Sequence, residues 1–333
     1  MSEPGLRVAV VGCGLIGQRR AQALTGAKLV ACADIDAKKA QALADARGCV
    51  AFDNWRTMLD RAPCDIVIVA TLHNSLAEIT LECVRHGRHV LVEKPAARLR
   101  SELEPVLAAA AQTGVQVRVG FNHRYHRALR KARELVDTGA VGPLLFIRGQ
   151  YGHGGRPGYD REWRADPKLS GGGELIDQGP HLIDLARWFL GDFAEVHGFA
   201  DTLFWDMPVD DNGFMLLRTA DRRTAQLHVS CTEWKNTFSF QIYGKTGKIE
   251  ITGLGGSYGV ERIAYYRMKP EMGPPETTIW EYPMLDDSWT VEFAEFVDDI
   301  RLMRTPAAGL REAMAVLGVI ERIYEVSGYD YRS

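Results

Sequence analysis

The amino-acid sequence predicts a two-domain α/β protein, in which a doubly wound parallel sheet precedes an α/β domain with a large, mainly antiparallel open sheet. The length of 333 residues exceeds the size at which one hydrophobic core usually keeps growing, so two domains are expected. Up to Phe121, apolar runs alternate with segments of helical period. Beyond Phe121, runs of alternating polarity follow one another between turn residues. We therefore place the domains at residues 1–121 and 122–333.

Strands and helices alternate regularly in the first predicted domain. Apolar, β-rich runs predict strands at 7–12, 28–34, 49–52, 65–70, 89–93 and 115–121. Helices are predicted between them at 15–25, 37–46, 54–60, 75–86 and 101–113. Strands that are apolar on nearly every residue are covered on both faces, and the helices between them require parallel crossovers. Ligands of such sheets bind at the carboxyl ends of the strands.

The second predicted domain consists of strands that favour an antiparallel sheet and a few helices. The strands are predicted at 143–151, 196–204, 212–219, 223–234, 237–244 and 247–253. The helices are predicted at 177–190, 289–303 and 310–325, and the terminal helix is a candidate for packing back on the first domain. Open sheets with apolar faces commonly pair with another subunit, so we expect a homodimer or homotetramer through this sheet.

The composition disfavours several classes of partner. The chain is 46% hydrophobic and 25% charged, and its formal net charge of −3 gives no long-range attraction to nucleic acid or to an anionic membrane. The N-terminus lacks a signal-peptide pattern, and no apolar run approaches the ~20 residues that span a bilayer. The six cysteines show neither metal-binding nor disulfide-framework spacing. We expect a cytoplasmic protein that binds neither nucleic acid nor membrane.

A GxGxxG motif follows the first predicted strand and begins the first predicted helix. Gly12, Gly14 and Gly17 let backbone N–H groups approach a pyrophosphate at the helix N-terminus. Asp34 ends the second strand 20 residues after Gly14, where a carboxylate accepts hydrogen bonds from ribose hydroxyls. The same carboxylate repels a 2′-phosphate, which favours NAD over NADP. Asp34 is also a candidate helix cap, but Asp36 is better placed for that role.

Two further stretches contain candidate catalytic residues. In VEKPAA, Lys94 lies at the carboxyl end of a strand, where its ammonium group either extends to solvent or faces the ligand. In GGGELIDQGPHLIDLARWFLG, Asp177 and His181 lie four positions apart at the start of a predicted helix. That helix should begin near Asp177, because Pro180 is tolerated only in a first turn. The pair has three interpretations: a metal site, an acid/base pair, or a helix start capped by Asp177.

A metal site would need further ligands beside this pair. His123, His153 and Asp184 are of suitable type, but no HxH, HExxH or paired-cysteine spacing accompanies them. We therefore favour the acid/base interpretation and expect no metal.

Three features together, VGCGLIG with Asp34, VEKPAA and IDQGPHLIDLARWFLG, resemble the glucose-fructose oxidoreductase / inositol dehydrogenase / MocA (Gfo/Idh/MocA) family. The resemblance runs over nearly the whole chain and implies a Rossmann domain, a C-terminal α/β domain and a cofactor in the cleft between them. It also implies that Lys94, Asp177 and His181 meet at the substrate hydroxyl. Two stretches depart from the family: Leu72 replaces a common proline, and residues 152–164 are an insertion that we expect to determine substrate choice.

The motifs and the resemblance give two sets of candidate contacts. Those for NAD are Gly12, Gly14, Leu15, Ile16, Gly17, Asp34, Ile35, Thr71, Leu72, His73, Asn74, Glu93, Lys94 and Asn122. Those for the substrate are Lys94, Asn122, Arg124, Tyr151, His153, Arg156, Trp163, Arg164, Asp177 and His181. Lys94, Asp177 and His181 are the candidate catalytic residues.

The stretch that precedes the triple glycine is rich in cations and aromatic residues. Its cations are Arg148, Arg156, Arg161, Arg164 and Lys168. Because guanidinium groups bind carboxylate or phosphate in bidentate fashion, they favour a sugar acid or a nucleotide-linked sugar as substrate. Alternatively, these cations pair with neighbouring acids, namely Asp160, Glu162 and Asp166. Tyr151, Tyr159 and Trp163 are candidates for a wall on which a sugar stacks, or for core residues.

These residues predict the reversible oxidation of a secondary alcohol on a sugar, sugar acid, nucleotide-linked sugar or cyclitol. His181 is the candidate base, Asp177 would orient its imidazole, and Lys94 would stabilise negative charge on the alcohol oxygen. The reverse assignment, with Lys94 as the base, stays open. Two alternatives are an NAD-dependent glycosidase that acts through transient C3 oxidation and a non-catalytic regulator that binds NAD or sugar.

Overall fold

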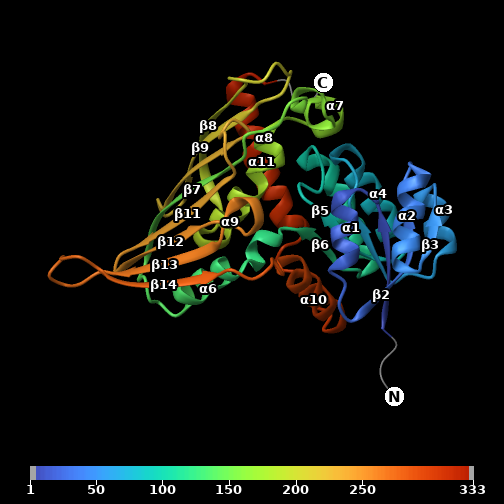
Figure 1. The fold of residues 1–333 in the computed structure, drawn as a ribbon, viewed down its shortest axis with the longest axis horizontal. Coiled ribbons are helices and arrows are strands. Elements are labelled where there is room, and N and C mark those ends of the chain that lie inside the picture. The colour runs from blue at the N-terminus through green and yellow to red at the C-terminus, as the bar shows by residue number, and fades with distance from the viewer. Residues whose placement is uncertain (1–4, 330–333) are drawn as a thin grey trace. The chain divides into compact units, whose positions relative to one another are not determined.

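The computed structural model describes residues 5–329, which divide into two compact units (Figure 1). The first unit contains the residues up to Phe121 together with Trp289–Met314. The second unit contains Asn122–Ser288 and the residues from Ala315 onward. The chain therefore returns to the first unit near its C-terminus. None of the described helices is long and apolar enough to cross a membrane.

The first unit contains a six-stranded parallel sheet. Its strands are β1 (Leu6–Val11), β2 (Ala27–Ala33), β3 (Val50–Phe52), β4 (Ile66–Val69), β5 (His89–Glu93) and β6 (Val117–Gly120). They pair in the order β3-β2-β1-β4-β5-β6, and every pairing is parallel. The order changes direction between β1 and β4, which is the point where doubly wound sheets bind ligands. The prediction of a doubly wound sheet is confirmed.

Helices cover both faces of this sheet, as the alternating pattern predicts. They are α1 (Leu15–Gln22), α2 (Ala37–Arg47), α3 (Trp55–Arg61), α4 (His73–Arg85), α5 (Glu104–Thr113) and α10 (Ser288–Arg301), with a 3-10 turn at Arg100–Leu103. Phe293 and Phe296 of α10 are buried in one core with side chains of α1, α2 and the central strands. Asp36 caps α2 as predicted, because its carboxylate accepts a hydrogen bond from the backbone N–H of Lys38.

The second unit contains an eight-stranded open sheet. Its strands are β7 (Leu144–Gly152), β8 (Phe193–Asp201), β9 (Asn212–Thr219), β10 (Thr224–Ser230), β11 (Thr237–Gly244), β12 (Gly247–Thr252), β13 (Glu261–Arg267) and β14 (Glu276–Tyr282). The order is β14-β13-β12-β11-β7-β10-β9-β8. Only the pairing of β7 with β10 is parallel among these described strands. The predicted mainly antiparallel sheet is confirmed.

Two strands of this sheet, β13 and β14, were not predicted from the sequence. β14 lies at the edge of the sheet, and most of its residues are exposed, so it lacks the alternation of apolar and polar residues on which strand prediction depends. β13 follows a glycine-rich turn and pairs with β14 along its whole length. The two strands form a long hairpin (Figure 1).

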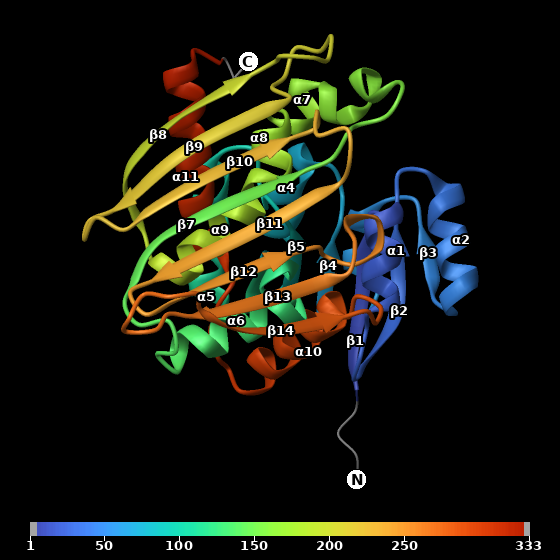
Figure 2. The same cartoon turned by 60° about the vertical axis from the view of Figure 1, so that its left-hand side comes forward.

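Helices cover one face of the open sheet. α6 (Arg127–Asp137) packs against β13 and β14, α8 (Glu174–Asp177) against β9 and β10, and α9 (Gly179–Leu190) against β7 and β10. Figure 2 shows the sheet from its other face, where none of the unit's described helices lies. The remaining short helices and turns are Asn122–Tyr125, Tyr159–Arg161, Trp163–Ala165, α7 (Pro167–Ser170) and Gly256–Tyr258, and the long C-terminal helix is α11 (Leu310–Ser327).

The helix predicted at 177–190 is divided in the structure. α8 ends at Asp177, and α9 begins at Gly179 with Pro180 in its first turn, where a missing N–H is tolerated. The N-cap of α9 is Gln178, which makes no side-chain capping hydrogen bond. The hypothesis that Asp177 caps the helix is therefore wrong, and its carboxylate is used elsewhere.

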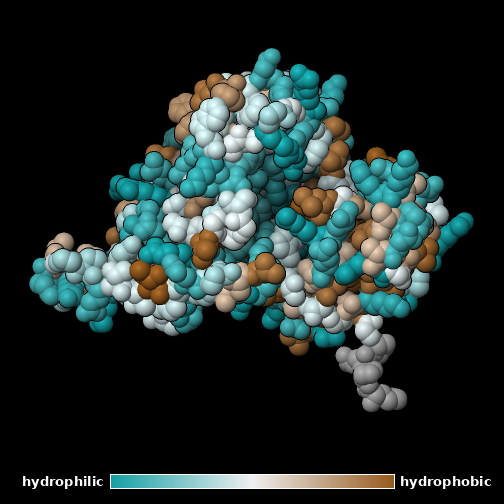
Figure 3. Space-filling view, in the orientation of Figure 1, coloured by the Kyte–Doolittle hydropathy of each residue, from teal (hydrophilic) through white to brown (hydrophobic). Residues whose placement is uncertain are grey.

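The surface and the cysteines fit the composition of the chain. Figure 3 shows one face of the molecule, on which hydrophilic residues predominate and hydrophobic residues are scattered. All six cysteines are free thiols, and five of them are buried. Burial raises the pKa of Cys49 to about 12. These thiols behave as small apolar core residues.

Candidate functional site

The loop between β1 and α1, which we call the glycine loop, contains three glycines, and the structure constrains each of them differently. Gly12 has a φ of +93°, and a Cβ on it would lie 2.4 Å from the carbonyl oxygen of Ala70. A Cβ on Gly17 would lie 1.8 Å from the carbonyl oxygen of Gly12. Gly14, by contrast, has open space where a Cβ would stand. The fold itself requires Gly12 and Gly17, whereas Gly14 leaves room at the N-terminus of α1, where backbone N–H groups attract an anion.

Asp34 lies directly after β2 and beside the glycine loop. Its Oδ2 accepts a hydrogen bond of 2.7 Å from the backbone N–H of Cys13, and its Oδ1 accepts one of 2.8 Å from the N–H of Asp36. The carboxylate therefore also fixes the loop in place. Two large apolar side chains beside it, Leu15 and Ile35, are 67% and 95% exposed. This combination of open loop, carboxylate and exposed apolar groups fits a dinucleotide with its ribose at Asp34.

The other predicted cofactor contacts in this unit differ in accessibility. Leu72 is the N-cap residue of α4 and makes no side-chain capping bond, while His73 is buried in the first turn. Thr71 accepts a hydrogen bond from the hydroxyl of Ser75, and Asn74 is exposed. These positions lie at the carboxyl end of β4, next to the point where the strand order changes direction. Their contacts with the cofactor stay predictions.

Glu93 was predicted to contact the cofactor, but the structure gives it a structural partner. Its Oε1 accepts a hydrogen bond of 2.5 Å from Nε of Arg20, which is 1% exposed. Arg20 also donates to the buried Glu292 of α10 and lies over the ring of Trp289. This buried network connects α1, α10 and the end of β5, immediately before Lys94. Glu93 thus acts first as a counter-ion for Arg20.

In the second unit, His181 lies in the first turn of α9 among aromatic rings. Its imidazole stacks on that of His123, with 3.7 Å between ring centroids and 23° between ring planes. Tyr151 approaches the same imidazole edge-on at 6.1 Å, and its hydroxyl hydrogen-bonds to Tyr258. Burial raises the pKa of Tyr151 well above its usual value and that of Tyr258 to about 12, so both phenols stay protonated. His181 itself is 5% exposed.

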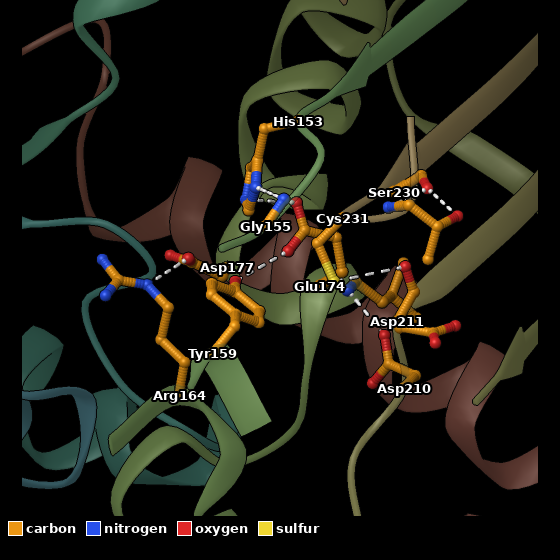
Figure 4. Close-up of polar contacts among 12 residues, drawn as sticks. His153, Gly155, Tyr159, Arg164, Glu174, Asp177, Asp210, Asp211, Ser230 and Cys231 are labelled. Carbon is orange, nitrogen blue, oxygen red and sulfur yellow. Dashed lines mark hydrogen bonds and ion pairs between the residues drawn. The ribbon is translucent and has the colours of Figure 1, made fainter. Parts of the chain in front are cut away.

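Two acidic residues of α8 contact the stretch 152–164, which we call the insertion loop (Figure 4). Asp177 accepts a hydrogen bond of 2.8 Å from Nε of Arg164. Glu174 lies 3.5 Å from Nε2 of His153 and accepts a 3.4 Å hydrogen bond from the hydroxyl of Tyr159. Glu174 and Asp177 are the first and last residues of α8 and lie on one face of it.

His153, a predicted substrate contact, is occupied by the chain itself. Its Nδ1 accepts a hydrogen bond of 3.0 Å from the backbone N–H of Gly155, and its Nε2 faces Glu174. Burial lowers the pKa of His153, and the charge of Asp177 opposes this shift. A neutral ring with its proton on Nε2 satisfies both partners. The structure therefore supports a role in holding the insertion loop.

The other predicted substrate-binding cations also have acidic partners. Arg124 is 7% exposed, and its Nε and Nη2 donate to the two oxygens of Asp184 at 2.7 and 2.6 Å. Arg156 pairs with Glu162, and Arg161 lies 3.7 Å from Asp160. The alternative that neighbouring acids neutralise the arginines of this stretch is thus supported for Arg156 and Arg161. The paired and buried Arg124 has a structural role.

Arg148, Asn122 and Trp163 are the other residues predicted to lie at or near the substrate. Arg148 lies over the rings of Phe146 and Tyr243, on the strands of the open sheet. The amide of Asn122 donates to the hydroxyl of Ser288 at 3.1 Å. The guanidinium of Arg164 lies over the ring of Trp163, 4.6 Å from its centroid.

Two site residues were missed at the level of sequence. Glu174 lies three positions before Asp177, and that spacing on a helix is a signal that would have found it. Tyr258 lies in a glycine-rich turn, 107 positions beyond its partner Tyr151 in the sequence, and no local pattern indicates it. In residues 5–329, no group of three or more His, Cys, Asp and Glu side chains is arranged to hold a metal ion.

The fold and the glycine loop are those of a two-unit, dinucleotide-dependent oxidoreductase. Residues 6–121 match the family described as oxidoreductase family, NAD-binding Rossmann fold, and residues 129–250 match the GFO/IDH/MocA C-terminal domain. The chain belongs to the Gfo/Idh/MocA oxidoreductase family, as its motifs predicted. NAD is the cofactor to which this family model refers.

The names of several similar proteins describe dehydrogenases of sugars or cyclitols. An inositol 2-dehydrogenase 3 of Saccharopolyspora erythraea is 33% identical over 256 residues, which cover 74% of this chain and 73% of that protein. A levoglucosan dehydrogenase of Pseudarthrobacter phenanthrenivorans is 30% identical over 168 residues, which cover 50% of this chain but only 43% of that enzyme. A solved levoglucosan dehydrogenase in complex with NADH and L-sorbose superposes with a TM-score of 0.87 at 21% identity, covering 97% of both chains.

Proposed function

We propose that the protein is an NAD-dependent dehydrogenase that interconverts a secondary alcohol and a ketone on a sugar or cyclitol. The observation that carries the proposal is the burial of both Asp177 and His181, four positions apart, in the unit that matches the family's C-terminal domain. Histidine is suited to take the hydroxyl proton, because its ordinary pKa lies near neutral pH. When bound, NAD would accept a hydride from the carbon that bears this hydroxyl group, so that the products are the ketone, NADH and one proton.

The roles of the three candidate catalytic residues follow from their chemistry. His181 takes the proton from the alcohol oxygen, and the stacked His123 ring holds its imidazole in orientation. Asp177 stabilises the positive charge that His181 acquires. Lys94, at the carboxyl end of β5, hydrogen-bonds the alcohol oxygen and stabilises its developing negative charge. The assignment of Lys94 to the same hydroxyl is part of the proposal.

The pairing of the arginines supports an uncharged substrate. The sequence favoured a sugar acid or nucleotide-linked sugar because of its cationic stretch, but Arg156 and Arg164 pair with Glu162 and Asp177. An anionic substrate would have to displace these carboxylates, whereas hydroxyl groups can hydrogen-bond beside them. The names of several relatives, inositol and levoglucosan dehydrogenases, refer to uncharged polyols, whereas two others are named as reductases of a dTDP-linked sugar. A free sugar, anhydrosugar or cyclitol is the substrate class that we propose.

A panel of substrates and two variants test this function. The purified protein with NAD should form NADH with a neutral polyol and not only with sugar acids or nucleotide sugars. Lys94→Met and His181→Asn should each lower kcat by about 10²- to 10⁴-fold, the usual effect of losing an acid/base group. Lys39→Met, which removes an exposed lysine of the same unit, is the matched control. Full activity of both variants, or NAD turnover without net NADH, would contradict the proposal.

We also propose that two copies of the chain associate through the uncovered face of the open sheet. Three exposed large apolar side chains near the β8 edge of the sheet are Phe199, Phe214 and Leu216, which are 64%, 39% and 50% exposed. They lie on the neighbouring strands β8 and β9, and such a patch is costly to leave in water. Light scattering should give a dimer or tetramer, and Phe214→Lys should shift it towards the monomer. A monomeric wild-type protein would rule out this association.

A further inference from the structure

The insertion loop is attached to α8 at both of its ends (Figure 4). Near its start, His153 faces Glu174, and the hydroxyl of Tyr159 donates to the same carboxylate. At its end, Nε of Arg164 donates to Oδ2 of Asp177 at 2.8 Å. The two anchoring residues, Glu174 and Asp177, are separated by three positions on one short helix. The position of the loop and that of Asp177 are therefore coupled.

The loop also has an apolar core, so its position is defined. Tyr159 and Ala165 belong to a buried cluster completed by Met207, Val209 and Cys231. A Cβ on Gly155 would lie 2.4 Å from the ring of Trp205, which shows how closely the start of the loop packs. A loop that is packed in this way presents Arg164 to Asp177 without a large loss of side-chain freedom on contact.

The surroundings of Arg164 distinguish a positioning role from recognition of an anionic substrate. Its Nε is used by Asp177, its Nη1 lies 3.7 Å from Glu162, and its plane lies over the ring of Trp163. The side chain is 33% exposed, while that of Asp177 is 7% exposed. A guanidinium between two carboxylates is a poor receptor for a third anion, but it holds the more buried carboxylate in a fixed orientation.

Arg164 also places a positive charge against the carboxyl group of Asp177. The charge of Asp177 acts on five titratable side chains around it: Arg164, His153, Tyr151, Tyr159 and Tyr258. Glu174 places a second carboxyl group on the same face of α8. Among these groups, the phenols stay neutral and burial favours the neutral form of His153, so Arg164 supplies the permanent positive charge. An adjacent cation favours the ionised form of a carboxyl group, whereas burial disfavours it.

We propose that Arg164 is a positioning residue of the reaction: it keeps Asp177 ionised and oriented, and so makes turnover depend on the seating of the insertion loop. The proposal rests on the proposed function, in which the Asp177 carboxylate stabilises protonated His181. It assigns the loop's final residue a role in the rate of the reaction and not in the binding of an anion. Arg164 acts through Asp177 and need not touch the substrate.

The test compares Arg164→Gln, Arg164→Lys and Arg161→Gln, the last being an 87% exposed arginine of the same loop. Arg164→Gln should lower kcat by about 10- to 100-fold with a smaller change in KM, and should move the acidic limb of the kcat profile up by about one pH unit. Arg164→Lys should restore the position of that limb, because it restores the charge. Arg161→Gln should behave as wild type, and NAD affinity should be unchanged in all three.

Two outcomes would overturn the proposal. One is a wild-type kcat and pH profile in Arg164→Gln, and the other is a rise in KM alone, which would make Arg164 a substrate-binding group. If Arg164→Gln does not fold, the kcat of Tyr159→Phe decides, because this variant releases the loop from Glu174 without touching Asp177. A several-fold lower kcat is expected, and wild-type kcat would refute the coupling.

Variants of the proposed catalytic residues separate the two proposals. Asp177→Asn and His181→Asn should both lose turnover if the proposed function is correct. If they do and Arg164→Gln does not, only the role of Arg164 fails. If they keep wild-type turnover, the proposed function fails. Limited trypsin digestion gives a readout without substrate: cleavage after Arg161 should be faster in Arg164→Gln than in Arg164→Lys, and equal rates would contradict the loop's attachment to Asp177.

Discussion

The glycine loop of the first unit and the α8 cluster of the second unit are built in different ways. The glycine loop is made of backbone: a Cβ would collide at Gly12 and Gly17, and backbone N–H groups of Cys13 and Asp36 hold Asp34. The α8 cluster consists of Glu174 and Asp177 of α8 and of His153, Tyr159 and Arg164 of the insertion loop. These side chains come from separate segments and pair with one another. The sequence of one short segment specifies a site that is built from backbone groups. A site that is built from paired side chains depends on which segments the tertiary structure brings together.

This difference predicts different responses to mutation. In the glycine loop, the same change from glycine to alanine should affect either the fold or the ligand, depending on what lies next to the Cβ. In the α8 cluster, removal of one side chain leaves a partner with an uncompensated charge, so the rate of turnover should change together with local order. The glycine loop therefore offers the cleaner separation of structure from ligand binding.

Gly17→Ala should mainly lower stability, whereas Gly14→Ala should mainly weaken the binding of NAD, and this is the largest difference that we expect. The Cβ in Gly17→Ala would lie 1.8 Å from a backbone oxygen that cannot move freely, so stability should fall by about 3 kcal/mol or more. The Cβ in Gly14→Ala meets no atom of the chain, but it would occupy the space in which we expect the pyrophosphate of NAD to bind. Without NAD, the Gly14→Ala variant should lose no more than about 1 kcal/mol of stability, the cost of alanine at the N-cap of α1, and its Kd for NAD should rise about tenfold or more.

Urea unfolding without NAD and fluorescence titration with NAD measure the two effects separately. The two variants serve as controls for each other, since both add one methyl group to the same loop. Wild-type NAD affinity in Gly14→Ala would show that the open space at this position is not used by the cofactor. Wild-type stability in Gly17→Ala would show that the turn tolerates a side chain, contrary to its geometry.

The same contrast explains how much could be predicted from the sequence. The six strands of the first sheet, the GxGxxG turn and the Asp36 cap follow from local pattern, and the structure confirms them. Arg124 was predicted to bind substrate because it lies near a strand end, yet it pairs with Asp184, 60 positions away. Glu93 pairs likewise with Arg20, 73 positions away. Such pairings depend on which segments the fold brings together, and no local spacing indicates them.

The break between α8 and α9 is a further case that sequence could not settle. The DxGPH pattern allows either one helix or two, because Pro180 fits any first turn. The start of α8 likewise depends on another segment: Oδ1 of Asp210 accepts from the N–H of Gly173, and its Oδ2 accepts from the N–H of Leu175. These two bonds fix the start of α8, and the hydroxyl of Tyr324 from α11 donates to the same carboxylate at 2.8 Å.

Asp210 and Asp65 should give the two units opposite dependences of stability on pH, and this is the smallest effect that we predict. Burial raises the pKa of Asp210 from 3.8 to about 6, despite its hydrogen bonds. Between these values the folded protein binds more protons than the unfolded chain, so this carboxyl group contributes stability below pH 3.8 that is lost as pH rises through about 6. A hydrogen bond from Arg7 lowers the pKa of Asp65, whose contribution is instead lost as pH falls below its usual range.

The free energy of unfolding of wild type and of Asp210→Asn therefore should differ by an amount that depends on pH. Because the variant does not titrate at this position, the wild type should gain about 1 kcal/mol over it between about pH 8 and pH 5. The constant cost of replacing an acceptor oxygen by an amide cancels in this comparison of slopes. Asp65→Asn should show no such change over the same range, since Asp65 stays ionised throughout it. A flat or reversed difference for Asp210→Asn would mean that the three hydrogen bonds outweigh burial and keep this carboxylate charged.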